Sequence, residues 1–179
     1  INSFVSDTEI TFENLYKSYM DDQKNRLKPS TIESKTYIFD KKILPFFKKY
    51  KIKEITPLLV RKWQNELIKG NLAQTYLRAI HEQLVAILNY AVKFYNLNKN
   101  PCSAAGRIGK KNAGEMNIWT LEEFKQFIEA IKHKKEAVVG FNILFYTGMR
   151  VGEMLALTIS DIDFEKCKIR INKTFQRIK

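Results

Sequence analysis

The stretch that decides the fold of this chain lies in its second half and reads Tyr146-Thr147-Gly148-Met149-Arg150-Val151-Gly152-Glu153. Before it, residues 137–146 are apolar nearly all round, which predicts a buried helix that stops at Gly148. After it, residues 151–157 predict a short further helix, so flanking structure on both sides holds the backbone of Arg150. Glu153 follows one helical turn later, within reach of the Arg150 guanidinium.

An arginine braced by a carboxylate suits phosphate chemistry. Its planar guanidinium offers two parallel hydrogen bonds to phosphate oxygens. A phosphoryl-transfer transition state needs such fixed positive charge where negative charge accumulates. The alternative is an ordinary ion pair at the start of a helix, which is common on protein surfaces. The spacing of Arg150 and Glu153 alone leaves both interpretations open.

The rest of the second half predicts a small mixed segment. Thr120 and Glu123 form a capping box that starts a helix with Phe124 and Ile128 on its apolar side. Residues 166–171 alternate apolar and basic side chains, which predicts a half-buried strand. No partner strand is evident, so we expect residues 118–179 to be an incomplete domain.

The first half predicts a bundle of four or five helices. Apolar residues recur at helical spacing over residues 12–20, 29–43, 56–70 and 72–97, with a connection at 21–28 and an interruption or bend at Pro45. Trp63 and Tyr76 fit apolar stripes and are assigned to the core. We therefore expect a helical domain over residues 1–100, and residues 101–117, with three glycines and Lys110-Lys111, predict a basic linker.

The charge predicts a polyanionic partner. The 179 residues carry 31 lysines and arginines against 19 aspartates and glutamates, a formal net charge of +12. The excess is +7 over residues 1–100 and +5 over residues 101–179, so no tail carries it. Nucleic acid is the usual partner, because each cation bound at a phosphate releases counterions. The alternative is a basic surface that serves only solubility.

Composition also excludes several protein classes. Hydrophobic residues make up 45% of the chain, which argues against global disorder. No apolar run approaches the roughly 18 residues of a membrane-spanning helix, and no secretory signal is visible. The first residue is Ile1, so we expect the chain to begin inside a longer protein. Cys102 and Cys167 cannot build a disulfide framework or a zinc site unaided, and we expect reduced thiols and no metal.

The decisive stretch resembles the first active-site box of the tyrosine recombinases, the integrases of phages and transposons. Residues 147–157 follow the family pattern T-G-x-R-x-x-E-x-x-x-L, and the Ser160-Asp161-Ile162-Asp163 turn follows them. Residues 119–124 are similar to the opening of the family's catalytic domain, and Asn100-Pro101 is similar to the end of its core-binding domain. The resemblance implies a mainly α fold, with an N-terminal SAM-like helical bundle (the core-binding domain) followed by a truncated α+β catalytic domain. It is nearest to integrases of Gram-positive phages and conjugative transposons.

This resemblance implies site-specific recombination that integrates a mobile element or phage. In the family a tyrosine hydroxyl attacks a DNA phosphodiester to form a 3′-phosphotyrosyl link, without metal or cofactor. Arg150 matches the arginine that binds the transition-state phosphate, and Glu153 matches the acidic residue that supports it.

The chain departs from the family pattern after this box. Neither His81 nor His133 opens an H-x-x-R motif, and both are expected to be solvated or capping residues. All eight tyrosines precede Arg150, whereas the family nucleophile follows it. Lys173 and Lys179 lie near the place of the catalytic lysine, and neither is assigned to it. We therefore predict that these 179 residues bind DNA without cleaving it.

Double-stranded DNA at core recombination sites is the expected partner, held by the two domains as a C-shaped clamp. Helix starts and long basic side chains suit phosphate oxygens and groove edges. The candidate contacts are Lys28, Ser30, Thr31, Lys35, Gln74, Thr75, Arg78, Lys110 and Lys111. For each the alternative is a solvated surface. We expect a tetramer on two DNA sites for the full-length parent, a monomer for this chain, no membrane partner, and the cytoplasm of a bacterial host.

Three other functions stay open. A helical DNA-binding regulator without catalysis explains the charge and the helices, but not the box around Arg150. A type IB topoisomerase uses the same chemistry without two defined sites. A structural, partner-binding fragment would not bind DNA at all. The sequence does not identify the target DNA, the preference for integration or excision, the remaining catalytic residues, or an arm-binding domain before Ile1.

Overall fold

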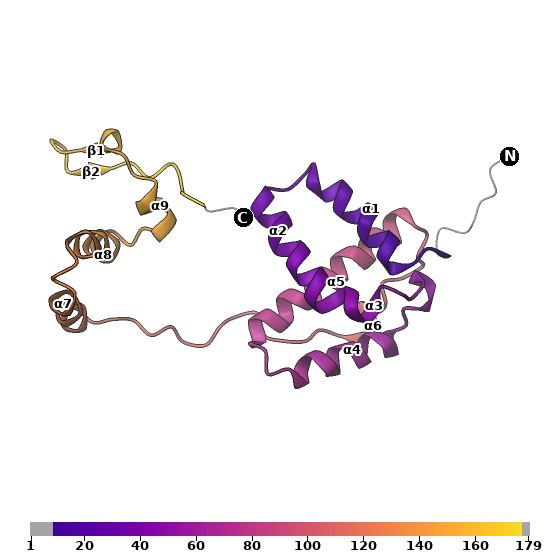
Figure 1. Cartoon of the computed structure of the whole chain (residues 1–179). Helices are drawn as coiled ribbons and strands as arrows, with labels where there is room; N and C mark the ends of the chain where they lie inside the picture. Colours follow the sequence, from indigo (N-terminus) through magenta and orange to yellow (C-terminus); the bar gives the residue numbers. More distant parts are fainter. Residues whose placement is uncertain (1–8, 177–179) are drawn as a thin grey trace. The chain divides into compact units, whose positions relative to one another are not determined.

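The computed structural model describes residues 9–176, and the chain divides into two compact units at Glu115 and Met116 (Figure 1). Unit 1 is helical, and unit 2 combines helices with a small hairpin. No helix among the described residues is both long enough and apolar enough to cross a membrane.

The predicted helices of unit 1 are all present. Thr11 and Thr56 cap the first and fourth, accepting hydrogen bonds from the backbone N–H groups of Asn14 and Leu59. The first helix continues past residue 20 to Lys24, so the connection is shorter than expected. The elements are α1 (Phe12–Lys24), α2 (Pro29–Ile38), a π-helical turn (Phe39–Ile43), α3 (Leu44–Phe47), a 3-10 turn (Ile52–Glu54), α4 (Pro57–Lys69), α5 (Gln74–Phe94) and α6 (Pro101–Ala105).

The bend expected at Pro45 is a π-helical turn just before it. Proline lacks an N–H and its ring crowds the carbonyl four residues earlier, so the α-helical hydrogen bonds cannot continue. Phe39 and Ile43 remain fully buried at the two ends of the wider turn. Trp63 on α4 reaches this turn and donates its indole N–H to the Lys42 carbonyl at 2.9 Å. The bend thus keeps Phe39 and Ile43 in the core and contacts α4 through Trp63.

The core of unit 1 surrounds α5, which contributes seven buried side chains along its 21 residues. Phe47 of α3 packs against Phe12 of α1 and against Trp63 of α4, with ring centroids 5.6 and 5.4 Å apart. Trp63 is buried in this core and Tyr76 is partly buried against it, so the assignment of both residues to the core is confirmed.

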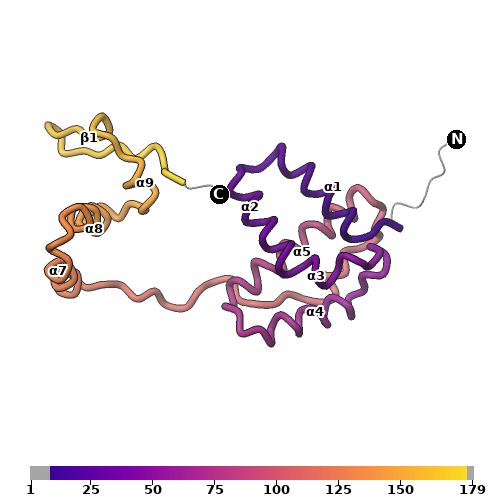
Figure 2. The backbone as a smooth tube through the Cα atoms, viewed as in Figure 1, coloured from indigo at the N-terminus to yellow at the C-terminus, as the bar shows by residue number. Residues whose placement is uncertain are grey.

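The structure differs from the expected linker at its beginning. Residues 101–105 form α6, which packs on α4 and α5, and Cys102 is buried. The Asn100 side chain caps α6 at the Cys102 N–H and also donates to the Val85 carbonyl. Burial raises the pKa of the Cys102 thiol to about 12. Between α6 and α7, residues 106–120 contain neither helix nor strand (Figure 2).

The first helix of unit 2 begins with the predicted capping box of Thr120 and Glu123. Phe124 of α7 stacks on Phe145 of α8, with ring centroids 3.8 Å apart. The elements are α7 (Leu121–Ala130), α8 (Lys135–Thr147), α9 (Val151–Leu155), a 3-10 turn (Ile159–Asp161), β1 (Ile162–Asp163) and β2 (Lys168–Ile169).

Three expectations for unit 2 are wrong. The helix predicted to be buried, α8, has no buried side chain, and Val139 and Tyr146 are more than half exposed. Within unit 2, α7 and α9 pack on α8 and leave part of its apolar surface open. The strand expected to lack a partner pairs antiparallel with β1, Ile162 opposite Ile169, and both residues of β2 are exposed instead of half-buried. The partner strand was missed because it is only two residues long.

Candidate active site and nucleic-acid interface

Arg150 lies at the junction of α8 and α9, as the sequence predicts. Gly148 ends α8 in a left-handed conformation with φ of 67°, which glycine adopts without steric cost. Met149 is buried next to it and anchors the junction. Arg150 follows as the N-cap of α9, in an extended conformation. The backbone on both sides of Arg150 is therefore fixed, while its side chain is 86% exposed.

Glu153 holds Arg150 at two points. One carboxylate oxygen accepts the Arg150 backbone N–H at 2.8 Å, and the other accepts a guanidinium N–H at 3.0 Å. These hydrogen bonds lower the pKa of Glu153, so the carboxylate stays ionised at neutral pH. The guanidinium is held on one side and open to solvent on the other, a geometry suited to receiving an anion.

Gly152 brings a distant segment to α9, a contact that the sequence analysis missed. The Phe175 N–H donates to the Gly152 carbonyl at 2.7 Å. A Cβ atom at Gly152 would lie 2.6 Å from Thr174 Oγ1 and 2.8 Å from the Phe175 carbonyl oxygen. Only glycine allows this approach. It brings residues 174–175 against α9 at a position two residues after Arg150.

Lys173, left unassigned by the sequence, takes part in an ion pair in unit 2. Its ammonium lies 2.7 Å from Asp161 Oδ2 and donates to Thr158 Oγ1 at 3.1 Å. These contacts and the Thr158 hydrogen bonds lower the pKa of Asp161 to about 2. Lys179 lies outside the described residues.

The predicted nucleic-acid contacts of unit 1 cluster at two helix starts. Both α2 and α5 begin without a side-chain cap, at Lys28 and Ala73, whereas threonines cap α1 and α4. Uncapped N-termini present backbone N–H groups and a positive dipole end to solvent. Ser30 and Thr31 lie in the first turn of α2, and Lys28 and Thr31 are exposed.

The structure brings three of the predicted residues together at the start of α5. The Lys110 N–H donates to the Gln74 carbonyl at 3.2 Å, so the chain after α6 returns to this helix start. Arg78 lies one turn further along α5 and pairs with Glu82 at 3.1 Å. Thr75 shares this first turn, and Lys111 follows Lys110 as an exposed side chain.

Lys35 is placed differently from the other candidates. Its ammonium donates to Tyr19 O–H at 3.1 Å and to Gln83 Oε1 at 2.8 Å, and it also lies over the Tyr19 ring. It therefore links α2 to α1 and α5 and is only half-exposed.

The expectation for His81 is wrong, because this side chain is fully buried in unit 1 and not solvated. Its Nδ1 lies 3.4 Å from Gln64 Nε2, which donates to the Gly106 carbonyl at 2.8 Å. Burial lowers the pKa of His81, so the ring is neutral. The other histidine, His133, is exposed in the turn between α7 and α8.

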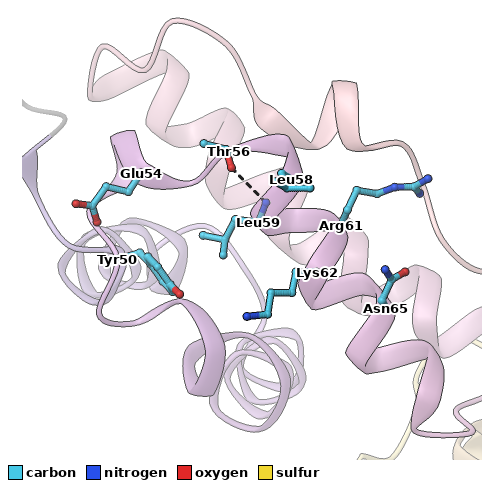
Figure 3. A pocket seen from close by; sticks show the side chains of 8 residues that line it. All are labelled: Tyr50, Glu54, Thr56, Leu58, Leu59, Arg61, Lys62 and Asn65. Atoms are coloured by element: carbon cyan, nitrogen blue, oxygen red, sulfur yellow. Dashed lines mark hydrogen bonds between the residues drawn. The ribbon is translucent and has the colours of Figure 1, made fainter.

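A pocket of unit 1 contains none of the predicted site residues. It has a volume of about 760 Å³ and lies between the start of α4 and the turn before it (Figure 3). The lining residues are Tyr50, Glu54, Thr56, Leu58, Leu59, Arg61, Lys62 and Asn65. The Thr56 cap of α4 forms part of its wall, so the pocket follows from the packing of this turn.

Comparison with known proteins supports the interpretation of both units. The model of the phage integrase N-terminal SAM-like domain matches residues 11–68, and that of the phage integrase family matches residues 118–179. The ICEBs1 integrase of Bacillus subtilis is 31% identical over 92% of this chain and 45% of its own length. The integrase of Mycobacterium phage L5 is 29% identical over 78% of this chain and 36% of its own length. The chain thus spans less than half the length of these curated relatives.

Solved structures share the fold. A lambda integrase dimer bound to a COC′ core site matches with a TM-score of 0.78 and 18% identity, covering 88% of this chain and 45% of that one. The Tn1549 transposon integrase in complex with circular intermediate DNA matches with a TM-score of 0.75 and 19% identity, covering 92% of this chain and 55% of that one. Two family matches, the shared fold and the box around Arg150 and Glu153 together show that the chain belongs to the phage integrase family of tyrosine recombinases, with a SAM-like helical domain followed by a segment of the integrase catalytic domain.

Proposed function

We propose that this chain is the core-site-binding part of a site-specific recombinase that integrates a phage or mobile element. The observation that carries the proposal is Arg150, held by Glu153 at 2.8 and 3.0 Å and open to solvent on its other side. Relatives named integrase and neighbours solved with core-site or circular intermediate DNA support it.

In the proposed reaction Arg150 binds the scissile phosphate. Its guanidinium donates to the non-bridging oxygens, whose negative charge increases in the transition state. Glu153 is a positioning residue that keeps the guanidinium from rotating away. A tyrosine of the full-length recombinase attacks the phosphorus, forms a 3′-phosphotyrosyl link and releases the 5′-hydroxyl. The eight tyrosines of this chain all precede Arg150, so these residues bind DNA without cutting it.

Unit 1 is proposed to bind the duplex through the starts of α2 and α5. Their uncapped N–H groups and adjoining hydroxyls suit phosphate oxygens. Lys28, Arg78, Lys110 and Lys111 add the positive charge that makes such binding salt-dependent. Lys35 acts mainly through the packing of α2, because protein groups already bind its ammonium.

The proposal also covers the domain organisation, the oligomeric state and the location of the protein. We propose three functional parts, residues 1–100, 101–117 and 118–179, with α6 packed on the first. This chain is a monomer, and its full-length parent works as a tetramer on two DNA sites in the cytoplasm of a bacterial host. No cofactor or metal takes part in the proposed reaction.

A suicide-substrate assay tests the proposal on these 179 residues. A nicked duplex traps any covalent protein–DNA adduct, and we expect binding in a mobility shift with no adduct after denaturation. A covalent adduct, or absence of DNA binding at low salt, contradicts the proposal. In the full-length recombinase, a requirement for two defined sites distinguishes recombination from type IB topoisomerase activity.

A further inference from the structure

The chain after α6 turns back and packs on the first turn of α5. Residues 107–110, here called the latch segment, contain a buried Ile108 that is 7% exposed. The Lys110 N–H donates to the Gln74 carbonyl at 3.2 Å, which ties the backbone of the segment to that of the helix. The end of unit 1 is therefore fixed against the same helix start that is proposed to bind DNA.

Gly109 makes this contact possible. It has φ of +75°, and a Cβ atom there would lie 2.2 Å from the Gln74 carbonyl oxygen and 2.6 Å from the Arg78 nitrogen. Both are backbone atoms of α5, so no rotamer change can relieve the clash. Two nearby glycines differ, because Gly106 has positive φ without neighbours within 4 Å and Gly114 has neither constraint. Residue 109 alone in this region needs glycine for both conformation and space.

The latch segment also places charge. Glu82 Oε1 lies 3.1 Å from an Arg78 nitrogen and 4.0 Å from Arg107 Nε. One carboxylate thus lies between two guanidinium groups, which leaves the group with net positive charge. The Arg107 side chain is 71% exposed, compared with 25% for Arg78. Arg107 therefore extends the basic edge formed by Arg78 and Lys110 into solvent.

We infer that Gly109 is a positioning residue that holds the latch segment on α5, so that Arg107 contacts the DNA backbone together with Arg78 and Lys110. This inference rests on the proposed DNA binding of unit 1. A fixed segment binds phosphates without first losing conformational freedom, which a free linker would have to lose on every encounter. The latch segment also fixes the place where the linker leaves unit 1, which is at the proposed DNA-binding surface.

The first test compares glycine variants of the 179-residue chain. Gly109→Ala breaks the close approach, Gly106→Ala introduces the positive-φ strain alone, and Gly114→Ala is the neutral control. Hydrogen exchange of the Lys110 amide reports the latch directly, and we expect faster exchange only in Gly109→Ala. Unchanged protection of this amide in Gly109→Ala overturns the latch itself.

The second test measures affinity for a 25-base-pair duplex of random sequence by fluorescence anisotropy at several salt concentrations. The measured quantity is the salt slope, the steepness with which the logarithm of the affinity falls with the logarithm of the salt concentration. We expect Arg107→Gln, which leaves the backbone untouched, to lower the salt slope by about one. Gly109→Ala should lower it by about one to two, because it releases both Arg107 and Lys110. Gly114→Ala should match the wild type.

The outcomes separate the inference from the function on which it rests. If the wild type binds and both Arg107→Gln and Gly109→Ala keep its slope, the role of the latch segment in DNA binding is overturned and the proposed function stands. If the wild type shows no salt-dependent binding, the proposed function fails and the role of Arg107 fails with it. The exchange of the Lys110 amide still reports on the latch in that case.

Discussion

Lys173 Nζ lies 2.7 Å from Asp161 Oδ2, across the hairpin formed by β1 and β2. The pair ties the chain after β2 to the turn before β1. Two residues later the Phe175 N–H returns to the Gly152 carbonyl on α9. The helix that begins at Arg150, the hairpin and residues 173–175 are therefore one connected assembly, and its stability bears on the position of the arginine.

The Asp161–Lys173 pair predicts an acid-sensitive hairpin. The pKa of Asp161 is lowered from 3.8 to about 2, so the unfolded state takes up its proton first as the pH falls. The contribution of this pair to the free energy of unfolding is complete above about pH 4 and is lost as the pH falls through 2. An NMR titration can follow the Arg170 amide, which donates to the Asp161 carbonyl at 2.8 Å. We expect Asp161→Asn to abolish the low-pH transition and Asp163→Asn to leave it, whereas a transition near the ordinary value of 3.8 would contradict the pairing.

Arg150 and Glu153 predict a graded loss of cleavage in the full-length recombinase. Arg150→Ala removes the proposed transition-state contact and should slow strand cleavage by about 10²–10³-fold with duplex binding retained. Glu153→Ala leaves the guanidinium present but unfixed, and misplacement of this kind costs up to about 10²-fold. Single-turnover cleavage of a nicked substrate measures both. Glu165→Gln, at an exposed carboxylate in the hairpin turn, is the control, and equal rates for Glu153→Ala and wild type would remove Glu153 from the site.

Relations between residues close in the sequence were predictable. The caps at Thr11, Thr56 and Thr120 and the pairing of Arg150 with Glu153 all join residues three apart, where helix geometry alone fixes the contact. The family box added the chemical meaning of Arg150.

Relations that depend on tertiary approach were not predictable. Gly109 and Gly152 look like ordinary flexible residues until another backbone is placed against them. The exposure of α8 depends on which elements cover it, and its composition alone indicated burial. For His81 a signal was present, because it lies four residues after Leu77 and three before Leu84 on the buried face of α5.

His81 predicts a second pH effect, confined to unit 1. Its pKa is lowered by burial, with Glu82, Arg78 and Arg107 as the nearby charges and Gln64 as the contacting amide. The contribution of neutral His81 to the free energy of unfolding is complete above the ordinary histidine pKa of 6.5. It is lost as the pH falls from there through the lowered pKa of the folded state. Urea unfolding at pH 7.5 and 5.0 should show a lower midpoint at pH 5.0. His81→Leu should flatten this difference and the exposed His133→Gln should keep it; a pH difference that survives in His81→Leu assigns the effect elsewhere.

Two threonines at helix starts predict opposite effects on stability and on DNA binding. Thr56 caps α4 with a 3.2 Å bond from the Leu59 N–H, so Thr56→Ala should lower the free energy of unfolding by about 1 kcal/mol. Thr31 lies exposed in the first turn of α2 and caps nothing, so Thr31→Ala should change that energy by less than about 0.5 kcal/mol. Loss of one hydroxyl bond to a phosphate should weaken duplex binding by about 2- to 10-fold in Thr31→Ala. Urea unfolding and anisotropy on the same two variants check both, and a Thr31→Ala chain with lost stability and unchanged affinity would show that this hydroxyl supports the fold instead of binding DNA.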